Sequence, residues 1–152
     1  MISLELDPLD PREGDYVLTV KQPWASLIMR GLKDVENRTW LPKIKSGQKI
    51  WIHSSSTFDR QGKMIIQDEY APESLEYRCC DESLPLGYML GTVIVKGAGH
   101  YSSPWAVLGN YQWKLISPVT AKNWEQLKVK GRLGLWRWSE ERDNPKHYLL
   151  GE

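Results

Sequence analysis

Hydrophobic and polar residues alternate in short blocks along this chain, and the pattern predicts strands more often than helices. Alternation rich in β-branched and aromatic residues predicts about six strands, at residues 16–21, 34–40, 49–56, 87–99, 111–117 and 131–139. Two stretches follow the helical period instead, at residues 23–31 and 60–70. In the first, Trp24, Leu27 and Ile28 form one apolar stripe. Gly31 then suits a left-handed cap at the end of that helix.

The close spacing of these strands predicts the fold class. A chain of 152 residues is the size of one domain. Short strands at close intervals favour an α+β fold, a small mixed or antiparallel β-barrel with two to four covering helices, over a doubly wound sheet. An open α+β sandwich is the alternative. We expect the folded domain to span residues 16–139, between an acidic N-terminal segment, 1–15, that is free to move, and a C-terminal tail, 140–152.

Charge is segregated along the chain, although its net value is only +1. Residues 1–15 have a net charge of −4 and residues 66–82 a net charge of −5, and we expect both stretches to be exposed. Residues 21–49 and 114–137 each have a net charge of +5, and both contain tryptophan. Phosphate binding depends on local positive potential, so the two basic stretches permit a nucleic-acid face if they converge. If they do not converge, they are ordinary solvated surface.

The sequence disfavours several kinds of site and location. No apolar run reaches the ~18–20 residues of a membrane span, and the N-terminus is acidic where a targeting peptide is basic, so we expect an intracellular protein, cytoplasmic or nuclear. Cys79 and Cys80 are the only cysteines, which predicts neither a zinc site nor a disulfide framework. His53, His100 and His147 lack the spacing of metal ligands. We therefore expect no metal and no cofactor.

Five segments of the chain resemble a known family. They are LTVKQPWASLIMRGLKDVENRTW, IWIHSS, LGTVIV, NYQWKLISPV and KGRLGLW, and together they cover nearly everything from Tyr16 to Trp138. These segments resemble the ASCH domain, a branch of the PUA-like fold, in the version that ends a human transcription coactivator. The G-x-K-x-x-E-x-R signature of that family is matched by Gly31, Lys33, Glu36 and Arg38.

The resemblance implies a β-barrel whose cleft is lined by the signature residues. It also implies nucleic acid, RNA or DNA, as the ligand, since PUA-like relatives bind RNA, and a role in transcription or RNA metabolism. Lys33 and Arg38 would offer a point charge and a planar fork to phosphate or a base edge, and Glu36 would accept from a base amino group. Trp40, among polar neighbours, is the better stacking candidate, since Trp24 suits the core equally well. The binding residues expected are Lys21, Gln22, Trp24, Ser26, Lys33, Glu36, Arg38, Trp40, His53, Ser54 and Lys130.

Three other interpretations stay open. Glu36 and Arg38 could form only an exposed ion pair on a strand, worth ~0–1 kcal/mol. The chain could bind an acidic protein partner through its basic face. It could also be a hydrolase or ribonuclease with Lys33 and Glu36 in the site and His53 as an acid or base.

The hydrolase interpretation comes from small relatives that deacetylate acetylated cytidine with a lysine and a threonine three residues later. Lys33 matches that lysine, but Glu36 stands at the threonine position. The nucleophile would then have to be Thr19, Ser26 or Ser54.

Overall fold

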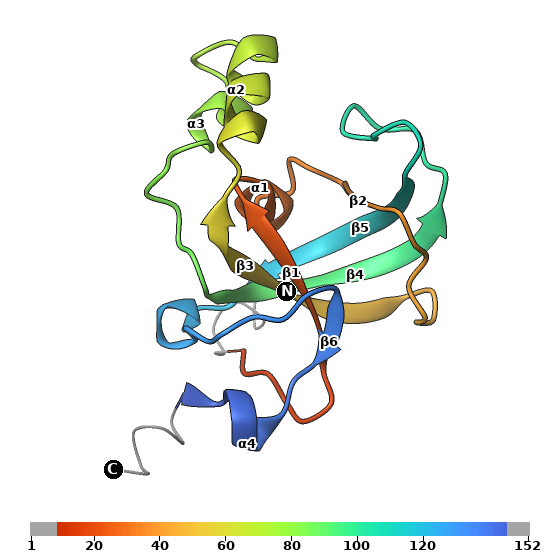
Figure 1. Cartoon of the computed structure of the whole chain (residues 1–152), viewed down its shortest axis with the longest axis vertical. Coiled ribbons are helices and arrows are strands. Elements are labelled where there is room, and N and C mark those ends of the chain that lie inside the picture. The colour runs from red at the N-terminus through yellow and green to blue at the C-terminus, as the bar shows by residue number, and fades with distance from the viewer. Residues whose placement is uncertain (1–8, 146–152) are drawn as a thin grey trace.

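The computed structural model describes residues 9–145, and its strands form one mixed sheet (Figure 1). The strands are β1 (Tyr16–Gln22), β2 (Val35–Arg38), β3 (Gln48–Phe58), β4 (Met89–Gly99), β5 (Tyr111–Thr120) and β6 (Leu135–Arg137). They lie in the order β2-β5-β4-β3-β1-β6. The β1–β3 pair is parallel, and each of the other neighbouring pairs is antiparallel. The predicted α+β class and the six strands are therefore confirmed.

The sheet curves around the short helix α1 (Trp24–Met29), as Figure 1 shows. This helix contacts β1, β3, β4 and β5, and Ala25, Leu27 and Ile28 are buried. Gly31 follows α1 with a φ of 73°, which confirms the predicted left-handed cap. Within residues 9–145, β2 and β6 are the edges of the sheet, so the fold is barrel-like with an opening between these two strands.

Two helices stand together at one end of the sheet, at the top of Figure 1. Helix α2 (Arg60–Glu69) confirms the predicted helix, and Asp59 caps its N-terminus by accepting from the amide of Gly62. Helix α3 (Leu75–Arg78) lies in the stretch that the sequence predicts as an acidic loop. The helix forms there because Ser74 caps it and because Cys79 and Cys80, both free thiols, are buried behind α2.

Residues near both ends of the described chain form hydrogen bonds with the sheet and with each other. The amide of Gly14 donates to the carbonyl of Trp138 over 2.9 Å, and Trp51 Nε1 donates to Asp15 Oδ2 over 3.2 Å. Helix α4 (Glu140–Asp143) follows β6, and its buried Asp143 accepts from the amide of Ser139. Residues 9–15 and 140–145 are therefore bonded to the sheet, and the rest of the two predicted terminal segments lies outside the described residues.

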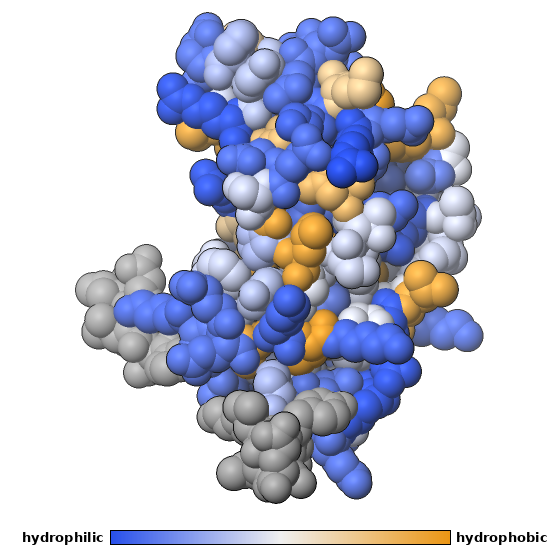
Figure 2. Space-filling view, turned by 60° about the vertical axis from the view of Figure 1, so that its left-hand side comes forward, coloured by the Kyte–Doolittle hydropathy of each residue, from blue (hydrophilic) through white to orange (hydrophobic). Residues whose placement is uncertain are grey.

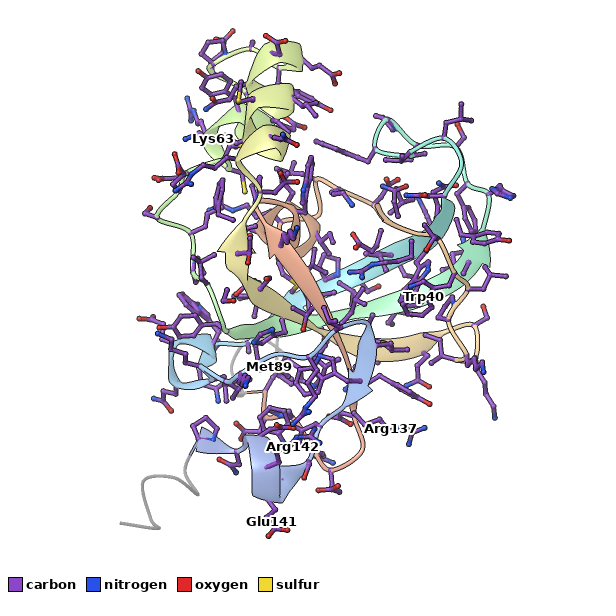
Figure 3. All side chains as sticks on the ribbon, in the orientation of Figure 1. Trp40, Lys63, Met89, Arg137, Glu141 and Arg142 are labelled. Atoms are coloured by element: carbon purple, nitrogen blue, oxygen red, sulfur yellow. The ribbon has the colours of Figure 1, made fainter. Side chains whose placement is uncertain are left out.

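Strand β1 is buried on both faces, so it separates two clusters of the core. Leu18 and Val20 point into the cluster that contains Trp113. Val17 points into the other cluster, with Trp136, Trp138, Trp51 and Met89, the last labelled in Figure 3. Trp136 and Trp138 are 7% and 2% exposed, so both belong to the core. None of the helices within residues 9–145 is long and apolar enough to cross a membrane.

Candidate nucleic-acid interface

A cleft runs between β1 and β2 at the opening of the sheet, and we call it the β1–β2 cleft. It consists of two adjoining cavities of about 480 and 320 Å³, which share Trp24, Glu36, Asn37 and Asp59 as lining residues. We call the first the aromatic part, because its other walls include Trp105, Ile65 and Ile66; its remaining lining residues are Lys33, Glu69, Pro104, Ala106 and Val107. We call the second the basic part, because Lys21, Arg38 and Arg132 line it.

Three charged side chains of the signature form one linked group at the floor of this cleft. Glu36 Oε1 lies 3.3 Å from Lys33 Nζ, and Glu36 Oε2 accepts from Arg38 Nε over 3.0 Å. Lys33 also donates to the carbonyl of Val35. Lys33 and Glu36 are only 5% and 7% exposed, and the Arg38 side chain is 23% exposed, so the Glu36–Arg38 pair is not the exposed ion pair that the sequence left open. A carboxylate between two cations leaves this group with a net positive charge.

Arg38 also links the two strands that border the cleft. Its Nη2 donates to the carbonyl of Thr19 in β1 over 3.0 Å. Strand β6 pairs with β1 only from Tyr16 to Leu18, so Thr19 lies just beyond the end of that pairing. Since Glu36 and Arg38 are two residues apart on β2, both side chains project on the same side of the strand. The guanidinium therefore lies between Glu36 and β1.

Two indoles, held in place by hydrogen bonds, form the wall of the aromatic part. Trp24 Nε1 donates to Asp59 Oδ2 over 2.9 Å, and the Trp24 ring meets Trp105 edge to face at 6.1 Å. Lys33 Nζ lies 5.8 Å from the centre of the Trp24 ring. Burial by itself raises the pKa of Asp59, but the hydrogen bonds from Trp24 and Gly62 outweigh it and hold that pKa below its ordinary value. Asp59 is therefore ionised at neutral pH.

Trp105 was not among the residues predicted from the sequence. It lies in the connection between β4 and β5, and its Nε1 donates to the carbonyl of Leu32 over 2.9 Å. Asn37 holds this connection, because its Nδ2 donates to the carbonyl of Trp105 and its Oδ1 accepts from the amide of Val107, each over 2.9 Å. The sequence shows a tryptophan within a predicted loop, but no local pattern indicates that this loop lies beside β2.

The two basic stretches of the sequence meet in the basic part of the cleft. Lys21 and Arg38 come from residues 21–49, and Arg132 comes from residues 114–137. The convergence is partial, because Lys114 is instead paired with Asp34 at 2.7 Å. Positive charge thus gathers at one end of the cleft, while Glu69 and Asp59 make the aromatic part more acidic.

Of the eleven residues predicted for binding, Lys21, Trp24, Lys33, Glu36 and Arg38 line the cleft. Trp40 and Lys130 are exposed but are not among its lining residues. In Figure 3, Trp40 lies well away from α2, where β2 leads into the segment before β3.

The other four predicted residues, Gln22, Ser26, His53 and Ser54, are buried and are not among the lining residues of the cleft. The side chain of Gln22 accepts from the amide of Ser26 and donates to the carbonyl of Pro85, so it ties α1 to the segment before β4. Ser54 Oγ bonds the backbone of Tyr88 in both directions. The side chains of Gln22 and Ser54 are thus bonded to the backbone of neighbouring segments.

His53 belongs to a buried chain of hydrogen bonds beside the cleft. Its Nε2 lies 2.9 Å from the carbonyl of Val129, which can only accept, so Nε2 carries the proton in the neutral ring. Nδ1 then accepts from Thr19 Oγ1 at 3.2 Å, and Thr19 Oγ1 accepts from Trp136 Nε1 at 3.0 Å. Burial lowers the pKa of His53 below its ordinary value, which keeps the ring neutral at physiological pH. Its role in this arrangement is to join β1, β3 and the segment before β6.

Among residues 9–145, no group of three or more His, Cys, Asp or Glu side chains is arranged to hold a metal ion. The charged groups of the cleft are Lys21, Lys33, Glu36, Arg38, Asp59, Glu69 and Arg132.

Parts of this chain are similar in sequence to known proteins. Human Activating signal cointegrator 1 is 41% identical over 44 residues, which is 29% of this chain and 7% of that protein. The mouse protein of the same name is 31% identical over 85 residues, 54% of this chain and 13% of that protein. The chain thus matches only a small fraction of the length of these relatives.

A solved structure shares the fold at low sequence identity. The crystal structure of a mutant ZmASCH protein from Zymomonas mobilis superimposes with a TM-score of 0.50 and 14% identity, and the match covers 91% of this chain and 97% of that one. The model of the ASCH domain matches residues 18–133, which include both borders of the cleft. This chain belongs to the ASCH domain family.

Proposed function

We propose that this chain binds single-stranded nucleic acid, with one nucleotide in the β1–β2 cleft. The observation that carries the proposal is the meeting of Lys21, Arg38 and Arg132, from three separate segments, beside a wall made by Trp24 and Trp105. Cations next to aromatic side chains suit a phosphate followed by an unstacked base. The faces of bases inside a duplex are hidden, so an unpaired strand fits this arrangement better.

The charges of the two parts suggest how the nucleotide lies. Phosphate would meet Lys21 and Arg132 in the basic part, where both side chains are exposed. The base would enter the aromatic part, where Glu69, a carboxylate that does not line the basic part, would repel a phosphate and favour the amino groups of a base. The name of the cointegrator relatives agrees with an action in transcription or RNA metabolism, which we include in the proposal.

The hydrolase alternative has less support in the geometry. Among the described residues, none with a hydroxyl or thiol side chain lines the aromatic part, where Lys33 lies. Thr19 and Ser55 line the basic part, but the Thr19 hydroxyl is bonded to Trp136 and His53, and the Ser55 hydroxyl accepts from the amide of Thr57. A binding function requires no nucleophile, so it accounts for the cleft with fewer assumptions.

Titration of labelled single strands of RNA and DNA, with duplexes of the same sequence, tests the proposal. We expect single strands to bind more tightly, with a log–log salt slope of about −0.7 for each phosphate contact. Lys21→Ala and Arg132→Ala should each weaken binding and lower that slope, whereas Lys122→Ala, which removes an exposed lysine that does not line the cleft, should not. Binding that ignores salt, or equal losses in all three variants, would count against the proposal. Displacement of the strand by an acidic peptide at equal concentration would favour a protein partner.

A further inference from the structure

A second basic surface lies outside the β1–β2 cleft, in the segment before β3 and at the end of β4. It consists of Lys43, Lys45, Lys49 and Lys96, all exposed, and we call it the lysine patch. None of these four lysines forms an ion pair with a residue in the part of the chain that the structure describes. Residues 39–49 and 94–102 contain no Asp or Glu. The patch is therefore a region of uncompensated positive charge on a nearly neutral protein.

The backbone holds these lysines on a defined frame. In the β3–β4 pairing Lys49 lies opposite Ile94, and Lys96 follows two residues later on β4, at an irregularity in the pairing of β4 with β5. The amide of Gly47 donates to the carbonyl of Val95 over 2.8 Å, and Ser46 Oγ donates to the carbonyl of Lys96. The loop that carries Lys45 is thus tied to the strand that carries Lys96.

Lys45 and Lys96 border a cavity of about 380 Å³. Its other walls are mainly apolar or aromatic and include Leu41, Ile44 and Tyr101. Two ammonium groups beside an apolar and aromatic floor match a phosphate with its attached sugar and base. An apolar ligand would leave the ammonium groups of Lys45 and Lys96 without a partner, so it fits this cavity less well.

Trp40 lies between the lysine patch and the β1–β2 cleft. Its ring packs edge to face on Trp113 at 5.0 Å, yet the residue is 38% exposed. One ring carbon would lie 3.7 Å from a Cβ atom added to Gly134, which lines the basic part of the cleft. The next residue, Leu41, lines the cavity of the lysine patch. An exposed indole therefore joins two basic surfaces.

We infer that the bound strand continues from the β1–β2 cleft over Trp40 to the lysine patch, where Lys45 and Lys96 bind its phosphates. The inference rests on the proposed function and adds a second phosphate subsite for the same ligand. Stacking of a base on Trp40 would bridge the two subsites, as aromatic side chains do in other single-strand binders. Each phosphate contact releases counterions, so the patch should contribute only when the strand is long enough to reach it.

The test compares a dinucleotide with a single strand of about ten nucleotides, within the length that single-strand modules cover. In the double variant Lys45→Ala/Lys96→Ala we expect the longer strand to bind several-fold more weakly and its salt slope to fall by about 1.4, for two lost contacts. Dinucleotide binding should stay at the wild-type value. Trp40→Leu should weaken binding of the longer strand alone. The double variant Lys122→Ala/Lys128→Ala removes the same charge near the opposite ends of β4 and β5 and should change neither ligand.

The possible results distinguish a failure of the continued path from a failure of the proposed function. If Arg132→Ala weakens both ligands while Lys45→Ala/Lys96→Ala changes neither, the cleft binds nucleic acid and the continued path is wrong. An equal loss from the two double variants would mean that only net charge matters, which also overturns the inference. If the wild-type protein binds neither ligand, the proposed function fails and the path fails with it.

Discussion

Arg38 on the edge strand β2 donates to the carbonyl of Thr19 on β1 over 3.0 Å, across the opening where the barrel-like sheet does not close. Elsewhere in the sheet neighbouring strands are joined by backbone hydrogen bonds, whereas β2 and β1 are joined here by the side chain of Arg38. The same guanidinium is held by Glu36, whose second oxygen faces Lys33. The signature residues thus shape the cleft as well as charging it.

Replacing Arg38 should cost stability as well as binding. Arg38→Ala removes a charged hydrogen bond to Thr19 and one to Glu36, and hydrogen bonds to charged groups contribute about 1.5–3 kcal/mol each. Because the side chain is 23% exposed, we expect a loss near the lower end of that range in urea unfolding. Arg38→Lys should recover little, since an ammonium group lacks the fork that reaches both partners. Trp136→Ala serves as a core reference, with an expected loss of ~3–5 kcal/mol. If the urea midpoint of Arg38→Ala equals that of the wild-type protein, the hydrogen bond from Arg38 to Thr19 does not contribute to stability.

Glu36→Gln should be among the most destabilising changes in the cleft. It leaves the buried ammonium of Lys33 without its carboxylate, and breaking a buried pair from one side costs about 3–5 kcal/mol. The double variant Lys33→Met/Glu36→Gln should be more stable than the sum of the two single losses predicts, because it leaves no buried charge unpaired. Additive losses in urea unfolding would mean that Lys33 and Glu36 act independently.

The stability of the protein should fall as the pH drops below about 6.5. Burial lowers the pKa of His53 in the folded state from its ordinary value of 6.5, so in that range the unfolded chain takes up a proton that the folded protein does not. The free energy of unfolding should decrease by up to about 1.4 kcal/mol per pH unit from this residue. Urea unfolding between about pH 7.5 and pH 5 should show a weaker pH dependence for His53→Gln than for wild type. His100→Gln, at an exposed position, should leave the profile unchanged; equal profiles for all three proteins would refute the assignment.

Gly131 has no room for a side chain. A Cβ there would lie 2.5 Å from His53 Cε1 and 2.9 Å from Thr19 Oγ1, so Gly131→Ala should displace the segment before β6 and cost about 1–3 kcal/mol. Gly99→Ala is the matched control, since a Cβ added at Gly99 meets nothing within 4 Å. Thermal unfolding should separate the two variants, and equal melting temperatures would show that the segment can move without cost.

We expect no release of cytidine when the protein is incubated with acetylated cytidine. Lys33 is bonded to Val35 and Glu36 and shares its part of the cleft with no hydroxyl or thiol side chain among the described residues. Chromatography of the reaction checks this, with Lys33→Ala run in parallel. Turnover that disappears in Lys33→Ala would make the chain an enzyme, whereas turnover that survives would indicate a contaminant.

The sequence by itself determined most of the local structure. Alternation located the six strands, and the helical stripe ending at Gly31 located α1, because these patterns express contacts between residues close together in the chain. The signature and its neighbouring segments indicated the family, and local charge showed which stretches could meet phosphate. The prediction of an acidic loop around residues 75–78 was wrong. The chain forms α3 there, because burial of Cys79 and Cys80 outweighs the polar composition of the stretch.

Only the tertiary structure decided which of the marked residues share a cleft. His53 and Trp24 are both predicted to bind the ligand, yet His53 is buried between strands and Trp24 lines the cleft. The position of Trp105 depends on hydrogen bonds to Asn37, 68 residues away, and no local pattern encodes such a contact. Likewise, Arg132, in the segment before β6, lines the same cavity as Arg38 on β2, although β6 and β2 are the opposite edges of the sheet. Local sequence preferences determine the helices and strands. The order and length of the strands determine which residues share the site, because pairing across the sheet joins segments that are far apart in the chain.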